Sequence, residues 1–270
     1  MLLAIDVGNT NIVFGFVQKG TLTHSFRLTT SDKKTSDEFG LALCEYLYCS
    51  NLSASSIDDV IISSVVPGVM FALESSIQKY IGKHPIVVDR DVIPKLIYPG
   101  RERLGSDRSV ACIAAMEKYG TPLIVLDFGT ATTMDSVGHN GQYFGGCIFA
   151  GMRTCTDALF QNAAMLPRID LVHPKSVLGM TTVHQIQAGT VMGCIGSIEY
   201  LVQKAQEEMP TDDRITVVAT GGLAPVIAAN TDIIDAVDSD LILSGLCLLY
   251  NQYKTEQLQY TTEINFQNHA

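Results

Sequence analysis

The chain opens with Leu2-Leu3-Ala4-Ile5-Asp6-Val7-Gly8-Asn9-Thr10-Asn11, an apolar run that ends in a polar turn. The apolar run is long enough for a buried strand, and its Gly-Asn pair tolerates the positive φ of a tight hairpin turn. Alternating apolar residues resume at residues 12–17, and a third strand-like run covers residues 21–28. This order predicts an antiparallel meander with one carboxylate at its first corner.

The turn after the first run has the chemistry of a phosphate site. Backbone amides and the side chains of Asn9, Thr10 and Asn11 can surround phosphate oxygens, and Asp6 can hold a hydrated magnesium ion that bridges them. A lysine is not required. Taken alone, the stretch is equally compatible with a plain hairpin, because Gly-Asn turns are common and Asp often ends a strand.

Composition indicates a globular protein that does not bind nucleic acid. The chain has 270 residues, of which 47% are hydrophobic and 17% charged, so it can bury a sizeable core. Its 28 acidic and 18 basic residues give a formal net charge of -10. Binding to a nucleic-acid backbone requires a basic face, and no run of Lys and Arg supplies one. Anionic ligands must therefore be met locally, by amides, a metal or a particular Arg.

Cysteine usage and hydropathy point to the cytoplasm. The seven cysteines are odd in number and form no Cys-x-x-Cys pair, which predicts a reducing compartment and no zinc site. The first apolar run is interrupted too early for a signal peptide. The longest apolar candidate, residues 60–73, is broken by Ser63-Ser64 and by Pro67-Gly68, so we expect no membrane span.

The opening pattern returns in the second half of the chain. Leu123-Ile124-Val125-Leu126-Asp127-Phe128-Gly129-Thr130-Ala131-Thr132-Thr133 again places Asp, one apolar residue and Gly behind an apolar run, 121 residues after the first copy (127 minus 6). Further along, residues 215–222 form a buried strand that ends in Thr220-Gly221-Gly222 before a helical segment, much as residues 60–68 do in the first half. Two matched Asp-x-Gly turns are hard to explain as ordinary hairpins.

We interpret the repeat as an internal duplication. It predicts an amino-terminal lobe over residues 1–120, a carboxy-terminal lobe over residues 121–253 and a polar tail over residues 254–270. Strands that open toward each other with Asp and Gly at their tips would face a shared cleft.

Two lobes with these openings resemble the acetate and sugar kinase, Hsp70 and actin superfamily. The resemblance implies an α/β fold of two duplicated RNase H-like lobes, the actin-like ATPase fold, with ATP in the cleft between them. Within that superfamily the chain is most similar to the type III pantothenate kinases, over residues 2–250. The motifs that carry this similarity are Asp6-Val7-Gly8-Asn9-Thr10-Asn11, Gly105-Ser106-Asp107-Arg108, Asp127-Phe128-Gly129-Thr130-Ala131-Thr132-Thr133, Gly145-Gly146-Cys147-Ile148 and Thr220-Gly221-Gly222.

The resemblance implies nucleotide and ion contacts. Asp6 would bind magnesium, and Asp127 matches the position assigned to a monovalent cation, potassium or ammonium. The residues that would contact ATP are Asp6, Val7, Gly8, Asn9, Thr10, Asn11, Ile12, Val13 and Thr130.

The resemblance also implies a substrate site. Asp107 matches the proposed general base, a carboxylate that orients the attacking hydroxyl and accepts its proton. Arg108 would hold the pantothenate carboxylate, since its fork of donors suits a planar anion. The residues that would contact substrate are Tyr98, Gly105, Ser106, Asp107, Arg108 and Thr182.

Several of these residues also have a purely structural interpretation. Asp107 could be an acidic residue at a helix start, Thr182 an N-cap, and Tyr98 a packed aromatic. Two positions depart from the family pattern: Ser106 stands where alanine is usual, and Ala150 replaces a proline. Gly189, Gly193 and Gly196 are spaced along one helical face, where small residues permit close helix packing, including at a dimer interface.

The leading functional hypothesis is ATP-dependent phosphorylation of pantothenate to 4'-phosphopantothenate, the first step of coenzyme A biosynthesis. The resemblance adds Mg²⁺ and K⁺ or NH4⁺ as cofactors and favours a homodimer. The alternatives are a kinase or phosphatase of the same superfold acting on another small hydroxyl compound, such as a sugar, and a non-catalytic regulator that binds ATP. The pair Asp107-Arg108 favours a working enzyme over a regulator, which has no need of that carboxylate.

Overall fold

The computed structural model describes residues 1–88 and 104–267 and divides into two compact units. Among the described residues, unit 1 comprises residues 1–88, 104–114 and 242–267, and unit 2 comprises residues 115–241. Each unit contains one five-stranded sheet. The predicted lobe boundaries at residues 120 and 253 mark the ends of the duplicated sequence segments, whereas the two units are defined by contacts between residues. The lobe boundaries therefore remain predictions.

The sheet of unit 1 has the strand order β3-β2-β1-β4-β5. Its central strand β1 pairs antiparallel with β2 and parallel with β4, so the predicted meander is confirmed and is extended by a parallel crossover. The strands are β1 (Leu2–Val7), β2 (Asn11–Gln18), β3 (Thr21–Thr29), β4 (Asp59–Ser64) and β5 (Ile86–Val87).

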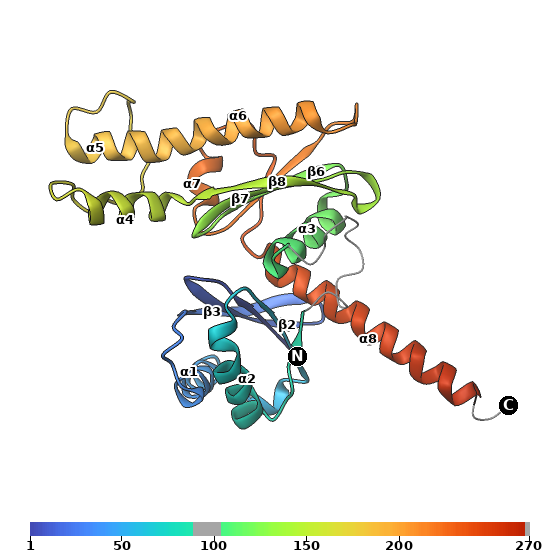
Figure 1. Cartoon of the computed structure of the whole chain (residues 1–270). Helices are drawn as coiled ribbons and strands as arrows, with labels where there is room; N and C mark the ends of the chain where they lie inside the picture. Colours follow the sequence, from blue (N-terminus) through green and yellow to red (C-terminus); the bar gives the residue numbers. More distant parts are fainter. Residues whose placement is uncertain (89–103, 268–270) are drawn as a thin grey trace. The chain divides into compact units, whose positions relative to one another are not determined.

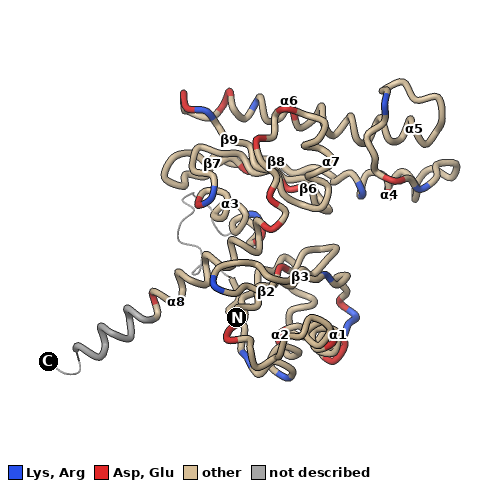
Figure 2. The backbone as a smooth tube through the Cα atoms, turned by 180° about the vertical axis from the view of Figure 1, so that it is seen from behind, with Lys and Arg blue, Asp and Glu red and all other residues tan. Residues whose placement is uncertain are grey.

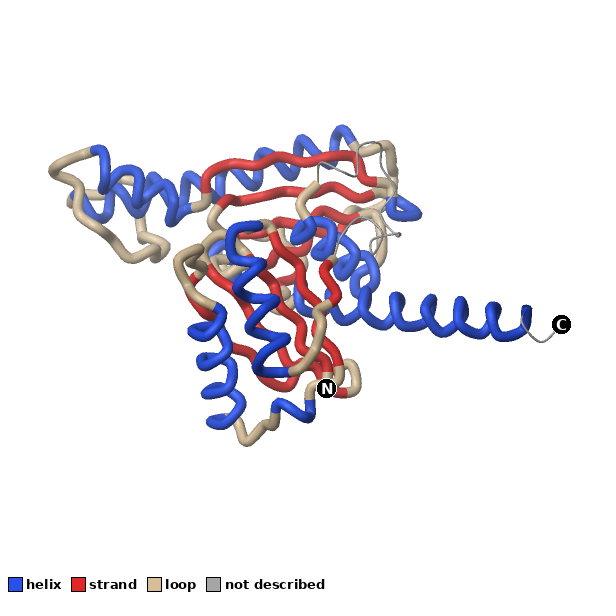
Figure 3. The backbone as a smooth tube through the Cα atoms, turned by 60° about the horizontal axis from the view of Figure 1, so that its bottom comes forward, coloured by secondary structure: helices blue, strands red, loops and turns tan. Residues whose placement is uncertain are grey.

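Helices cover both faces of this sheet, which explains why β1 is a continuous apolar run. Its odd-numbered residues, including Leu3 and Ile5, pack in the cluster formed with α1 (Ser36–Cys49) and α2 (Pro67–Ile81). Figure 1 shows these two helices beside each other. Its even-numbered residues Leu2 and Ala4 pack in the cluster formed with the first half of α3 (Ser106–Tyr119) and with α8 (Leu241–Gln267). Figure 3 shows α1 and α2 lying together against the strands of unit 1.

The sheet of unit 2 repeats this topology. Its order, read from β8, is β8-β7-β6-β9-β10, with β6 antiparallel to β7 and parallel to β9. The strands are β6 (Leu123–Phe128), β7 (Ala131–Val137), β8 (Tyr143–Ala150), β9 (Thr216–Thr220) and β10 (Ala236–Val237). The central strands of the two sheets have the same burial pattern, buried except at the Asp one residue before the end. The predicted duplication is therefore present in the structure.

A helical layer buries one face of the second sheet. Side chains of β6, β7 and β9 share a core with α4 (Met152–Asn162), α6 (Gly193–Glu208) and α7 (Ala224–Ala228). Residues 182–208 are helical throughout: α5 (Thr182–Gln187) passes through a π-helical segment, Ala188–Met192, into α6. A single π turn inside a long helix often marks a functional region.

Three details differ from the sequence-based expectation. Gly8 does not adopt positive φ, so the first corner is a three-residue connection and not the positive-φ turn expected of Gly-Asn. The sequence predicts a loop up to Arg108 and a helix from about Ser109, whereas α3 begins at Ser106 and includes Asp107 in its first turn. Helix α8 continues to Gln267 and includes most of the predicted tail. Strand β10 is too short for a periodic pattern, and its pairing with β9 depends on tertiary structure.

Among the described residues, charged side chains of both signs are distributed over each unit, and no basic cluster stands out (Figure 2). Within the described residues, no helix combines the length and apolar character needed to cross a bilayer.

Helix α1 offers a test of the first unit's stability. Thr35 and Glu38 form a reciprocal capping box: the Thr35 hydroxyl accepts from the Glu38 amide, and the Glu38 carboxylate accepts from the Thr35 amide at 2.8 Å. Thr35→Ala should lower the free energy of unfolding by about 1 kcal/mol. Urea denaturation measures the change, and Ser36→Ala, which leaves the box intact, should have a smaller effect. Equal losses in both variants would contradict the capping role.

Candidate active site

The connection between β1 and β2 is held by backbone and threonine hydrogen bonds. The Gly8 amide donates to the Asn11 carbonyl at 3.0 Å, while the Thr30 hydroxyl donates to the Gly8 carbonyl at 2.6 Å and the Thr30 amide to the Thr10 carbonyl at 3.0 Å. Asn9 and Thr10 remain exposed at the tip. The turn is thus fixed from the end of β3 while its tip stays accessible to a ligand.

Asp6 lies one residue before the end of β1, between the paired residues Val13 of β2 and Ser63 of β4. It is half-buried, whereas Ile5 and Val7 beside it are fully buried, and its Oδ1 atom is out of reach of solvent. The register therefore places the carboxylate at the carboxyl-end edge of the parallel β1–β4 pair, where ligands of open α/β sheets bind.

The start of α3 is fastened to the end of β4. The Ser63 hydroxyl donates to the Ser106 hydroxyl at 3.0 Å, and the Ser106 hydroxyl donates to the Ser64 carbonyl at 3.1 Å. Because Ser63 is the register partner of Asp6, these bonds bring the Gly105–Arg108 motif to the edge that carries Asp6. Two stretches that sequence alone could only list separately are thereby joined within unit 1.

Asp107 is folded back over its own helix end. Its Oδ1 accepts a hydrogen bond from the Arg108 amide at 2.7 Å, and a Cβ atom added to Gly105 would stand 2.6 Å from that oxygen. A larger residue at position 105 would displace the carboxylate from this place. Asp107 and Arg108 are both half-buried, so each side chain keeps partial access to solvent. Carboxylates are favourable at a helix N-terminus, and the structural interpretation of Asp107 is compatible with the chemical one.

The first corner of unit 2 is built in the same way. The Gly129 amide donates to the Ala131 carbonyl at 3.1 Å, and the Thr130 carbonyl accepts from the Gly151 amide at 3.1 Å and from the Thr154 hydroxyl at 2.6 Å. As at the first corner, a threonine hydroxyl holds the connection, here that of Thr154. Thr130 is exposed at the tip, as Thr10 is. The two corners are similar in position and in sequence, but the second connection is one residue shorter than the first.

Asp127 is enclosed by glycine. A Cβ added to Gly221 would stand 2.4 Å from Asp127 Oδ1 and 2.7 Å from the Phe128 backbone, and Gly221 has a φ of 90°. Asp127 pairs in register with Thr220 of β9, just as Asp6 pairs with Ser63 of β4. The late Thr-Gly-Gly sequence is therefore part of the wall around Asp127.

Thr182 and Tyr98 are the two remaining predicted substrate contacts. Thr182 is exposed and is the first residue of α5, while Thr181 is the N-cap, its hydroxyl accepting from the His184 amide at 3.3 Å. The alternative of Thr182 as N-cap is therefore wrong. Tyr98 lies outside the described residues.

Sequence reasoning missed two buried carboxylates of unit 2. Asp238 follows β10 and accepts from Lys118 at 2.6 Å and from Tyr119 at 3.1 Å. The hydrogen bond to Asp238 raises the pKa of Lys118, and burial raises the pKa of Tyr119. Asp135 of β7 is 2% exposed and accepts from the Tyr143 hydroxyl at 2.6 Å. Asp135 is visible as an acidic residue inside an otherwise uncharged strand, but Asp238 has no local sequence signal.

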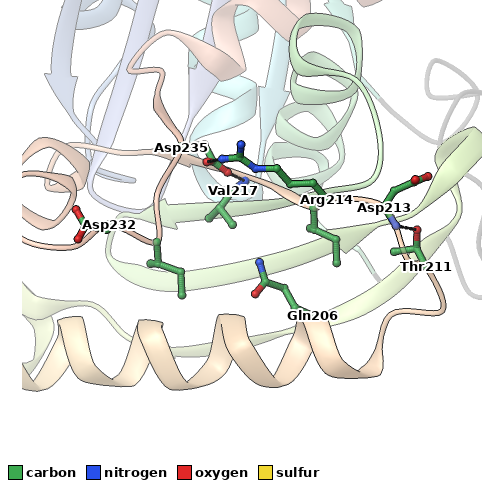
Figure 4. A pocket seen from close by; sticks show the side chains of 9 residues that line it. Gln206, Thr211, Asp213, Arg214, Val217, Asp232 and Asp235 are labelled. Carbon is green, nitrogen blue, oxygen red and sulfur yellow. Dashed lines mark hydrogen bonds and ion pairs between the residues drawn. The ribbon is translucent and has the colours of Figure 1, made fainter.

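A hollow of about 410 Å³ opens elsewhere in unit 2, between the end of α6 and the start of β9. Figure 4 shows Arg214 reaching Asp235, an ion pair of 2.5 Å, with Asp232 and Asp213 nearby on its rim. It lies at the amino end of β9, whereas Thr220 and the paired Asp127 lie at the carboxyl end. This hollow is therefore separate from the corner that carries the motif residues.

Among residues 1–88 and 104–267, no group of three or more His, Cys, Asp or Glu side chains is arranged to hold a metal ion. Asp6 and Asp127 each stand as one carboxylate beside a turn of backbone amides and hydroxyls. Mg²⁺ commonly binds through one or two carboxylates together with substrate phosphates and water, so this donor set fits a metal that arrives with a nucleotide.

Comparison with known proteins identifies the family. The sequence model described as type III pantothenate kinase matches residues 2–204. The chain belongs to the type III pantothenate kinase family. A type III pantothenate kinase of Syntrophotalea carbinolica is 43% identical over 257 residues, covering 94% of this chain and 100% of the relative. One of Agathobacter rectalis is 41% identical, covering 93% and 97%.

A solved structure confirms the fold class of this family member. The activator of the 2-hydroxyisocaproyl-CoA dehydratase from Clostridium difficile, solved with bound ADPNP, has a TM-score of 0.51 at 12% identity, covering 96% of this chain and 97% of that one. At this identity the likeness concerns the fold alone. With the repeated sheet order, it confirms the predicted α/β fold of two duplicated lobes.

Gly221 provides a test of the wall around Asp127. Gly221→Ala should lower the free energy of unfolding by about 1–3 kcal/mol, because the new Cβ meets a backbone and a carboxylate and because φ is positive. Gly222→Ala is the matched control, since nothing lies within 4 Å of its Cβ position. Urea denaturation of both variants measures the difference. A Gly221→Ala variant as stable as Gly222→Ala would contradict the close approach.

Proposed function

We propose that the chain transfers the γ-phosphate of ATP to the hydroxyl of pantothenate and so produces 4'-phosphopantothenate in the first step of coenzyme A biosynthesis. Membership in the type III pantothenate kinase family supports this function. The observation that carries it in this chain is the Asp107-Arg108 pair, fastened within unit 1 to the edge that bears Asp6.

In this mechanism Asp107 is the general base. Phosphoryl transfer relies mainly on positioning and on charge stabilisation, so a carboxylate has only to orient the attacking hydroxyl and accept its proton. The hydrogen bond from the Arg108 amide holds the Asp107 carboxylate, and Gly105 leaves the space that the carboxylate occupies. Arg108 pairs its guanidinium with the pantothenate carboxylate and thereby orients the hydroxyl end of the substrate. Gly105, Ser106, Thr182 and Tyr98 complete the proposed substrate contacts.

The first corner of each unit provides proposed contacts to ATP. Residues 6–13 contribute exposed amides and side chains in unit 1, and Thr130 contributes its exposed hydroxyl in unit 2. Asp6 is the proposed magnesium ligand, and Asp127, enclosed by Gly221, is the proposed ligand of K⁺ or NH4⁺. These cations, when bound with ATP, reduce the negative charge that opposes attack on the phosphate.

We also propose that the enzyme is a cytoplasmic homodimer. Gly189, Gly193 and Gly196 are exposed along one helix face, and nothing lies within 4 Å of their Cβ positions. Each mid-helix glycine costs about 1 kcal/mol relative to alanine, so an exposed stripe of them suggests that another helix approaches closely. Met165 and Met180, 90% and 92% exposed, add apolar surface in the same unit. A cytoplasmic location suits the seven free cysteines and a supply of ATP.

Asp107→Asn tests the general base. The variant should lose about 10²–10⁴-fold in kcat, because the amide cannot accept the proton, while ATP binding is preserved. Steady-state turnover with pantothenate, ATP, magnesium and potassium measures the rate, and calorimetry measures nucleotide affinity. Asp37→Asn, an exposed carboxylate of α1, is the control. A near-parental rate would refute the assignment, and a parent that binds ATP without producing phosphopantothenate would favour the regulator.

Gly193→Trp tests the dimer. Gly193 is exposed and nothing lies within 4 Å of its Cβ position, so we expect the variant to fold but to elute as a species of 29.3 kDa in place of one twice that mass. Light scattering coupled to size exclusion gives the masses. Leu41→Trp, at an exposed position on α1, should leave the dimer intact. A parental protein that is already a single chain, or a Gly193→Trp variant that stays dimeric, would contradict this interface.

A further inference from the structure

Ser63 is the polar residue that stands out on β4. It is fully buried, lies among apolar neighbours Ile61 and Ile62, and is the cross-strand partner of Asp6. A hydroxyl at such a position loses its contact with water, so it is tolerated only with a hydrogen-bond partner. Its partner comes from α3, 43 residues further along the chain: the Ser63 hydroxyl donates to the Ser106 hydroxyl at 3.0 Å.

The bond continues beyond Ser106. The Ser106 hydroxyl donates a hydrogen bond to the Ser64 carbonyl at 3.1 Å. Because its hydrogen is used in this bond, it acts as the acceptor toward the Ser63 hydroxyl. The Ser64 hydroxyl meanwhile accepts from the Val66 amide at 3.1 Å, which fixes the chain as it leaves β4. Ser106 is thus held at two points on the end of one rigid strand.

Asp107 is the residue next to this anchor. Its carboxylate accepts a hydrogen bond from the Arg108 amide and lies close to Gly105. Both contacts are made within the four-residue segment that contains Ser106. A Cβ at Gly105 would also stand 3.5 Å from Val65 Cγ1, so the loop before α3 packs directly on the segment after β4. Any movement of Ser106 away from β4 therefore moves the Asp107 carboxylate as well.

We propose that Ser63 is a positioning residue for the reaction: through Ser106 it holds the first turn of α3 on β4 and sets the position of the Asp107 carboxylate relative to Asp6. Ser63 itself touches neither substrate nor reacting atoms. The inference rests on the proposed role of Asp107 as general base. Small displacements of a catalytic group have large effects, since a shift of about 1 Å can reduce a rate by about 10²-fold.

The test uses the full-length enzyme and four variants: Ser63→Ala, Ser106→Ala, the double variant, and Ser76→Ala. Ser76 of α2 is the matched control, because it is also a buried serine of unit 1 and its hydroxyl donates to the Leu73 carbonyl at 2.7 Å. We expect Ser63→Ala to lower kcat by about tenfold with little change in KM for ATP, and Ser76→Ala to leave kcat unchanged. Ser106→Ala should have the same effect in this chain, although alanine is usual at that position in the family, because here it leaves the buried Ser63 hydroxyl without its partner.

Two further readouts separate positioning from general destabilisation. The double variant should lose no more activity than Ser106→Ala alone, because Ser106→Ala already removes the Ser63 contact as well as the bond to the Ser64 carbonyl. In an Asp107→Asn background, Ser63→Ala should change the residual rate by less than about twofold, because its effect passes through Asp107. Melting temperatures of all variants show whether each is folded at the assay temperature. Ser106 is half-buried, so its variant keeps the test available if Ser63→Ala does not fold.

The outcomes distinguish the inference from the function on which it rests. If Asp107→Asn is inactive and both serine variants retain parental kcat, the positioning role is wrong and the general base stands. If the losses of the two serine variants multiply, or if Ser63→Ala reduces the Asp107→Asn rate tenfold again, the serines act independently of Asp107 and the inference fails. If Asp107→Asn keeps a near-parental rate, the general base and the positioning role fall together.

Discussion

The pairing of β1 with β2 on one side and with β4 on the other is the constraint on which unit 1 depends. Because β1 is central, its alternate residues must fill two helical layers, and its only carboxylate is confined to the carboxyl end. The parallel register then sets Ser63 opposite Asp6, and the contact of Ser63 with Ser106 brings α3 to the same edge. A strand register thus determines which distant residues can meet at the site.

Unit 2 has the same strand pairing around its central strand, but different residues surround its carboxylate. Asp127 and Thr220 occupy the positions of Asp6 and Ser63, and a threonine hydroxyl closes each first corner. The surroundings differ, however. In unit 1 the end of β4 receives the start of α3, which carries a carboxylate and an arginine, whereas in unit 2 the end of β9 turns through Gly221 directly against Asp127. The duplicated frame is therefore shared, and the acceptor chemistry is proposed only for the first copy.

Most elements near the site were predictable because their signals are local. The apolar runs of β1, β4, β6 and β9 and the Thr35 cap of α1 are all visible within short windows. The sequence-based predictions were wrong where tertiary hydrogen bonds overrode the local conformational preference of a residue. Gly8 suggested a positive-φ turn, but bonds from Thr30 hold the connection in another form. Ser106 looked like a loop residue, yet its hydrogen bonds to β4 let α3 begin there.

The sequence by itself determined the duplicated α/β frame, the family and the identity of the motif residues, because periodicity and motif order are properties of neighbouring residues. Only the tertiary structure decided how these motifs are supported: that Ser63 meets Ser106, that Gly221 encloses Asp127, and that Thr181, not Thr182, caps α5. The first two contacts join segments far apart in the chain, so they depend on strand register and helix placement. Hydrogen-bond geometry, which residue type alone does not specify, selects between the adjacent threonines.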